Sequence, residues 1–187
     1  VAADPLFTSS YTGVNAGMVI VVADDPGMHS SQNEQDSRHY AQASKIMMLE
    51  PSDSEECLQY SKLAYELSER FDTPVLLRLT TRVSHSRSLA DVGERVDNGL
   101  KAYEKNPQKY VMVPANAKVK HVEVEKRILD QIAYCEGEAV EAGLNTVEYN
   151  SKKIGVITSG ICYQYAKEAL GENASYLKLG CVYPLPV

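Results

Sequence analysis

The sequence predicts an α/β fold, in which a parallel sheet is covered by helices on both faces. One observation is that the apolar run at 18–23 is continuous rather than alternating, which is typical of a strand buried on both faces, and a second strand-like run follows at 75–79. Another is that segments with helical spacing separate such runs, so that helix and strand alternate from residue 4 to residue 79. This alternation favours right-handed βαβ units with parallel strands.

The elements of this first region follow from local signals. Strands are expected at 18–23, 46–49 and 75–79, and helices at 4–14, 33–44 and 52–71. Asp4 should cap the first helix with Pro5 at its first position, because these residue types favour those places. Ser52-x-x-Glu55 has the pattern of a capping box for the third helix.

The pattern changes after this region, and we expect three parts in the chain: 1–95, 96–151 and 152–187. The middle part reads as a connecting arm with a charged helix over 122–142, whose apolar stripe is Val124, Ile128, Ile132 and Ala139. The last part begins a second α/β domain with strands at 154–158 and 176–180 around a helix. Both ends look cut, since the chain starts on Val1 and stops shortly after a strand.

Composition and charge exclude several classes of protein. The net charge of −6 argues against a nucleic-acid partner. No apolar run reaches the roughly 20 residues that span a bilayer, and no signal-peptide pattern is present, so we expect a cytoplasmic protein. The four cysteines lie far apart, without the close spacing of zinc or iron–sulfur ligands. We therefore expect reduced, buried thiols and no metal site in this chain.

Candidate ligand-binding residues follow from the predicted sheet. Ligands of open parallel sheets bind at the carboxyl ends of the strands, where three polar loops are expected: 24–35, 50–54 and 80–87. The first loop is longer than the roughly two to six residues of a usual strand-to-helix connection, and long loops are often functional. The alternative is that these are solvated loops, because Asp, Pro, Gly and Ser are ordinary turn residues.

Three motifs in these loops carry a family resemblance. The runs 24–36 (DDPGMHSSQNEQD), 49–54 (LEPSDS) and 75–87 (VLLRLTTRVSHSR) resemble the large (alpha) subunits of indolepyruvate:ferredoxin oxidoreductases. The resemblance extends to the arm at 110–114 and to the start of the second domain. The Glu34-Gln35 pair also resembles a motif of the wider 2-oxoacid:ferredoxin oxidoreductases, within the thiamine diphosphate-binding superfamily.

The resemblance implies a fold and an activity. Residues 1–95 would be an N-terminally truncated pyrimidine-binding-like domain, and 152–187 the start of a transketolase C-terminal-like domain. The intact enzyme would convert aryl pyruvates such as indolepyruvate to acyl-CoA and CO2 with ferredoxin as electron acceptor. It would use thiamine diphosphate and Mg²⁺, with 4Fe-4S clusters in segments outside this chain. Its implied partners are a beta subunit, ferredoxin, coenzyme A and the 2-oxoacid, in an oligomer without nucleic acid or membrane.

The resemblance also implies which residues of this chain belong to the site. The activating glutamate, the Mg²⁺ motif and the cysteine clusters of the family are absent from this chain, so we expect no catalytic residue and no metal ligand in it, and no activity of the chain alone. Residues of the first loop should line the cofactor and substrate cleft: His29, Ser30, Ser31, Gln32, Asn33 and Gln35. Arg38 should help to hold the substrate carboxylate. The alternatives are another 2-oxoacid:ferredoxin oxidoreductase, acting on pyruvate or branched-chain substrates, and a non-catalytic α/β interaction module.

Overall fold

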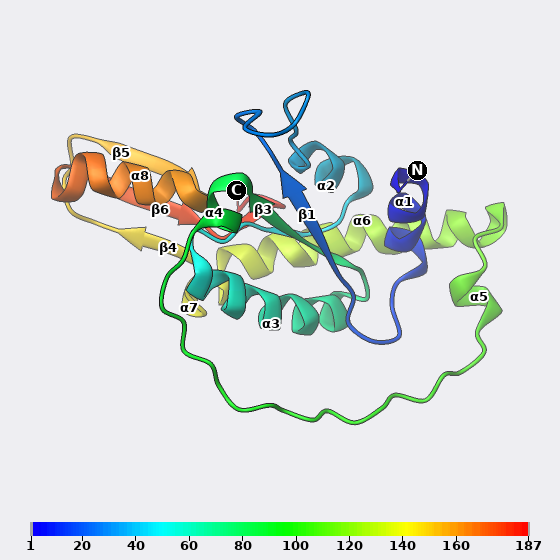
Figure 1. Cartoon of the computed structure of the whole chain (residues 1–187). Helices are drawn as coiled ribbons and strands as arrows, with labels where there is room; N and C mark the ends of the chain where they lie inside the picture. Colours follow the sequence, from blue (N-terminus) through cyan, green and yellow to red (C-terminus); the bar gives the residue numbers. More distant parts are fainter. Residues whose placement is uncertain (1, 187) are drawn as a thin grey trace.

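The computed structural model describes residues 2–186, so Val1 and Val187, at the ends of the first and last predicted parts, lie outside the described residues. The strands lie in two sheets, one central and one that extends to the left in Figure 1. The strands are β1 (Val19–Asp24), β2 (Met48–Leu49), β3 (Val75–Thr80), β4 (Asn145–Glu148), β5 (Gly155–Ser159), β6 (Ser175–Leu179) and β7 (Cys181–Tyr183). The α-helices are α1 (Ala3–Thr12), α2 (Arg38–Ser44), α3 (Ser54–Phe71), α4 (Thr81–His85), α5 (Pro107–Tyr110), α6 (Pro114–Glu136), α7 (Glu138–Glu141) and α8 (Gly160–Leu170).

The first sheet confirms the predicted α/β class. Its strand order is β1-β3-β2-β7, and β1, β3 and β2 run parallel to one another. The register sets Asp24 beside Thr80 and Leu49 beside Leu77, so the carboxyl ends of the three strands lie at one edge. β7 pairs antiparallel with β2. The sequence analysis did not predict β7, a three-residue strand formed after the chain returns from the second sheet.

The continuous apolar runs are explained by two cores, one on each face of this sheet. Met47, Leu49 and Leu77 point into a core that helix α3 closes with Tyr60, Ala64 and Leu67. Met48 and Leu76 point to the opposite face, where Ala41 of α2 and Leu6 of α1 cover them. Side chains alternate between the faces along a strand. Positions that face either core are therefore apolar, and each large side chain buried stabilises the fold by roughly 1.5–3 kcal/mol. The expected burial of the first run on both faces is wrong in part, because β1 is an edge strand and Val21 is 58% exposed.

Two of the predicted helix starts are wrong in detail. α1 begins at Ala3 with Ala2 at the cap, so Asp4 lies inside the first turn, where its charge favours the helix N-terminus. The predicted second helix began at residue 33, whereas α2 begins at Arg38. The shift follows from the preceding loop, whose backbone N–H groups bind side chains of Asp24 and Asp25 instead of forming a helical turn.

The capping box of α3 lies one residue later than predicted. Asp53 is the N-cap, and its carboxylate accepts the backbone N–H of Glu56 at 2.9 Å. The Glu56 carboxylate accepts both the N–H and the hydroxyl of Ser52, each at 2.8 Å. Ser52 and Asp53 are both good cap residues, so the sequence pattern alone fits either position.

The middle and last parts of the chain build the second sheet. β5 and β6 pair parallel around α8, as expected. β4 falls within the range expected for the arm, but it pairs antiparallel with β6. The long arm helix α6 already begins at Pro114, whose fixed φ suits the first helical position. Val124 and Ala139 of the predicted stripe are buried, and Ile128 and Ile132 are half-buried.

Residues 86–106 form no regular element and arc along the outside of the molecule between α4 and α5 (Figure 1). The four cysteines are free thiols, and Cys135 and Cys181 are buried as predicted. The expectation of burial is wrong for Cys162, which is exposed on α8, and Cys57 is half-buried. Within residues 2–186, no helix is long and apolar enough to cross a membrane.

Candidate functional site

A buried ion cluster lies at the carboxyl edge of the first sheet. Arg78 of β3 donates from Nε to Asp24 Oδ2 at 2.6 Å and from Nη1 to Glu50 Oε1 at 2.7 Å. The exposed fractions of Arg78, Asp24 and Glu50 are 3%, 3% and 4%. Charges this deeply buried persist only when they are paired and hydrogen-bonded. The cluster therefore joins the ends of β1, β2 and β3 into one unit.

Asp24 also fixes the far end of the first loop. Its carboxylate accepts the backbone N–H of Ser37 at 2.7 Å and the Ser37 hydroxyl at 2.6 Å. The loop 25–36 therefore leaves β1 and returns to the same side chain before α2 begins. Arg78 Nη2 lies 3.7 Å from Asp36, which adds a further charge contact at this return point.

Asp25 fixes the backbone in the middle of the loop. Its carboxylate accepts the backbone N–H groups of Ser30 at 2.8 Å, His29 at 3.0 Å and Ser31 at 3.0 Å. The hydroxyl of Thr81 donates to the same carboxylate at 2.8 Å. The Ser30 N–H, the Thr81 hydroxyl and the other two N–H groups hold the pKa of Asp25 well below its usual range. These hydrogen bonds fix the backbone of the loop at residues 29–31 without using the side chains of those residues.

The structure separates the predicted site residues into two groups. His29 and Arg38 line a cavity of about 150 Å³ at the carboxyl edge. The other five predicted residues do not line this cavity. Ser31 is half-buried, and four are exposed: Ser30, Gln32, Asn33 and Gln35. Within residues 2–186, the hydrogen bonds of His29, Ser30 and Ser31 come from their backbone N–H groups and not from their side chains.

Arg38 is oriented by a neighbouring carboxylate. Its Nε and Nη2 donate to the two carboxylate oxygens of Asp36 at 2.8 and 2.7 Å. This pairing lowers the pKa of Asp36 to about 2 and raises the pKa of Arg38, because each group favours the charged form of the other. The guanidinium is therefore held in one plane at the rim of the cavity.

The second sheet supplies the opposite wall of this cavity. Ser159, Ile161 and Cys162, at the start of α8, line it together with Glu50, Thr80 and Arg82. Gly160 has a φ of +52°, and a Cβ there would lie 2.5 Å from Glu50 Oε1. A glycine is therefore required for the close approach of α8 to the ion cluster.

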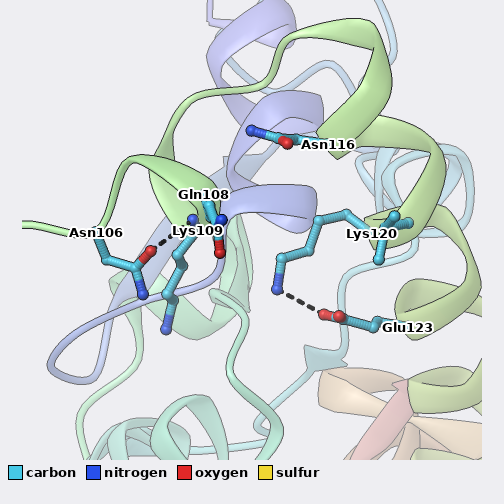
Figure 2. Close-up of a pocket in the computed structure, with 7 residues that line it drawn as sticks. Asn106, Gln108, Lys109, Asn116, Lys120 and Glu123 are labelled. Atoms are coloured by element: carbon cyan, nitrogen blue, oxygen red, sulfur yellow. Dashed lines mark hydrogen bonds and ion pairs between the residues drawn. The ribbon is translucent and has the colours of Figure 1, made fainter.

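A second cavity, of about 430 Å³, lies between α5 and the start of α6 (Figure 2). Most of its polar side chains have partners in the fold. Asn106 accepts the Lys109 N–H at 3.0 Å, Lys109 Nζ binds Val14 O and Asp72 at 2.8 Å each, and Lys120 pairs with Glu123. The contacts of Lys109 attach the arm to the first domain. In residues 2–186, no three His, Cys, Asp or Glu side chains gather in an arrangement that could hold a metal ion.

Comparisons with known proteins agree on one relationship. No protein-family model matches the chain. The chain is 45% identical to indolepyruvate oxidoreductase subunit IorA of Methanothermobacter thermautotrophicus and 39% identical to that of Archaeoglobus fulgidus. Each comparison covers all of this chain and 30% of the relative, so the chain spans less than a third of the relatives' length.

A solved structure shows the same fold. It is a 2-oxoglutarate:ferredoxin oxidoreductase from Magnetococcus marinus with 2-oxoglutarate, coenzyme A and succinyl-CoA bound. The TM-score is 0.64 at 14% identity, over 100% of this chain and 40% of that chain. Over its whole length, the chain is thus related to a segment of indolepyruvate oxidoreductase subunit IorA, which confirms the resemblance seen in its loop motifs.

Proposed function

We propose that this chain is part of the large subunit of a thiamine diphosphate-dependent enzyme that oxidatively decarboxylates aryl pyruvates such as indolepyruvate. The products are acyl-CoA and CO2, and ferredoxin accepts the electrons. The observation that carries this proposal is the 45% identity to subunit IorA across all of the chain. The proposal includes a beta subunit as partner, Mg²⁺ and 4Fe-4S clusters held outside this chain, an oligomeric assembly and a cytoplasmic location.

The first loop fits a role in holding the cofactor ring. Asp25 fixes the backbone at residues 29–31, so little ordering entropy is lost when a ligand binds there. The side chains of Ser30, Ser31, Gln32, Asn33 and Gln35 are neutral donors and acceptors, which suits the neutral polar groups of an aminopyrimidine ring. We assign ring contacts to His29, Ser30, Ser31, Gln32, Asn33 and Gln35. Thiamine diphosphate, when bound, supplies the carbanion stabilisation, and the protein orients it.

Arg38 fits a role in binding the substrate carboxylate. A guanidinium pairs with a carboxylate through parallel N–H groups in one plane, and Asp36 already fixes that plane. Asp36 engages Nε and Nη2, which leaves Nη1 to reach the substrate. The cavity beside Arg38 has a volume of about 150 Å³, which suits a carboxylate but not an indole ring. The aryl group of the substrate would then extend away from this cavity.

Turnover by the complete enzyme tests the proposal. The large subunit and its partner are purified together, and reduction of ferredoxin is followed with indolepyruvate, pyruvate and a branched-chain 2-oxoacid. We expect the highest kcat/KM for indolepyruvate and no activity of residues 1–187 alone. A preference for pyruvate would overturn the substrate assignment. Absence of activity with every 2-oxoacid would instead favour the non-catalytic interaction module.

A matched pair of variants tests the role of Arg38. Arg38→Gln removes the charge at the cavity, and Arg87→Gln makes the same change at an exposed position on the neighbouring segment. A charged hydrogen bond contributes roughly 1.5–3 kcal/mol, so the KM for the 2-oxoacid should rise about tenfold or more in the first variant only. Equal KM values in both variants would contradict the assignment.

A further inference from the structure

We propose that β1 pairs along its open edge with an apolar β-strand that the complete large subunit supplies from outside this chain. β1 is the outermost strand of the first sheet, whose order is β1-β3-β2-β7. The proposal makes β1 an interior strand of the complete subunit. It rests on the relationship to subunit IorA and on the geometry of β1, and it does not depend on the reaction or the substrate proposed above.

The backbone of β1 has one row of donors and acceptors without a partner strand. The Val75 N–H donates to Met18 O at 3.0 Å, and β1 and β3 keep a regular parallel register along the whole of β1. In this register every second residue of β1 turns its backbone groups towards β3. Those of Val19, Val21 and Ala23 therefore point to the opposite edge, where no strand lies within residues 2–186. Such a row of unpaired groups is a template for another strand.

The side chains of β1 lack the features that protect a permanent edge. Edge strands that stay exposed commonly carry charges, prolines or β-bulges, which prevent pairing with further strands. Residues 19–23 are Val-Ile-Val-Val-Ala, without a charge or a proline, and the register with β3 is unbroken. Val21 is 58% exposed in the middle of this apolar strand. A continuous apolar run of this kind is typical of an interior strand of a parallel sheet.

An apolar groove of about 830 Å³ runs beside the same strand. Met18, Ile20 and Val22 line it on the sheet, and Leu6 of α1 and Tyr40 of α2 line it on the helices. Side chains alternate between the two faces of a strand, so a strand added next to β1 would direct every second side chain towards this groove. The groove therefore fits a strand whose residues on the α1 and α2 side of the sheet are apolar.

The remainder of the large subunit is the source of this strand. The chain covers 30% of each IorA relative, so more than two thirds of such a subunit lies outside it. A segment of the same polypeptide is present at an effective concentration in the millimolar range, far above the concentration of a second copy in dilute solution. A strand from the same subunit is therefore favoured over β1 of a second copy.

Hydrogen–deuterium exchange at single-residue resolution tests this pairing, on residues 1–187 and on the complete large subunit, each at two protein concentrations. In the chain alone we expect slow exchange at Ile20 and Val22, whose N–H groups face β3, and fast exchange at Val19, Val21 and Ala23. In the complete subunit the three edge positions should slow by about tenfold or more, because their N–H groups are then hydrogen-bonded.

Two outcomes of the exchange experiment would overturn the proposal. One is fast exchange at the three edge positions in the complete subunit. The other is slowing that appears in the chain alone and grows with protein concentration, which would assign the edge to a second copy. Neither measurement involves turnover, so failure of this proposal is distinguishable from failure of the proposed reaction.

Two proline variants provide an independent test. Val21→Pro removes an N–H that points to the open edge, whereas Val22→Pro removes one that faces β3. Val22→Pro should lower the Tm of both the chain and the complete subunit. Val21→Pro should leave the Tm of the chain nearly unchanged and lower that of the complete subunit, because the proline ring obstructs the added strand. Equal Tm values of the parent and Val21→Pro subunits would contradict the pairing.

Discussion

Replacement of Arg78 by methionine should destabilise the fold more than any comparable change at the surface. Arg78 is 3% exposed and pairs with both Asp24 and Glu50, which are 3% and 4% exposed. Removing one partner of a buried ion pair leaves an uncompensated charge and costs about 3–5 kcal/mol. A loss of about 3 kcal/mol lowers the ratio of folded to unfolded chains by about a hundredfold or more. This is a large part of the roughly 5–15 kcal/mol by which such domains are stable.

The assay is urea denaturation followed by far-UV circular dichroism, since the chain has 12 tyrosines and no tryptophan. The combined variant Asp24→Asn, Glu50→Gln, Arg78→Met should recover much of the loss, because it leaves no buried charge.

Arg87→Met is the matched control, because it makes the same chemical change at an exposed residue. It should alter the free energy of unfolding by less than about 0.5 kcal/mol. A loss below about 1 kcal/mol in Arg78→Met would refute the reasoning that Arg78 is needed to pair the two buried carboxylates.

Three further predictions follow from local geometry. Gly160→Ala should lower stability by roughly 1–2 kcal/mol or more, because a left-handed φ disfavours a Cβ and Glu50 stands in its way; an unchanged Tm would contradict the close approach of α8. Asp53→Ala should lower the free energy of unfolding, measured in urea, by about 1 kcal/mol, because α3 loses its N-cap. Full retention of stability would show that the hydrogen bond from the Glu56 N–H to Asp53 does not stabilise the helix. The pKa of Asp36 is lowered to about 2, so its stabilising effect should be complete above pH ~4 and lost as pH falls from ~4 to ~2. Urea titrations at pH 5 and pH 3 should therefore show a smaller decline in Asp36→Asn than in the parent chain, and equal declines would exclude this role.

Much of the first sheet could be predicted because its signals are local. The run at 18–23 is apolar at every position and the run at 75–79 at every position except Arg78, and the structure places both in a sheet with a core on each face. β7 could not be predicted in this way, since Cys181–Tyr183 is short and its partner β2 lies far away in the sequence. Pairing of that kind depends on tertiary structure and leaves no periodic pattern.

The site was predictable in position but not in detail. The rule that parallel strands place their carboxyl ends together located the loops 24–35 and 50–54 at one edge, but most of the third predicted loop, 80–87, is helix α4. The ion cluster was missed because Arg78 lies 54 residues from Asp24 and 28 from Glu50, although an arginine inside an apolar strand is itself a signal. The wall formed by α8 was missed because nothing local indicates how the second sheet packs on the first.

Hydrogen–deuterium exchange on the complete two-subunit enzyme tests most directly whether this sheet edge forms the cleft wall. Exchange is compared with and without thiamine diphosphate and a 2-oxoacid. The account predicts slower exchange at residues 29–38 when the ligands are present, and no change at 86–106, which forms no regular element. Unchanged exchange at 29–38, with protection confined to other parts of the enzyme, would contradict it.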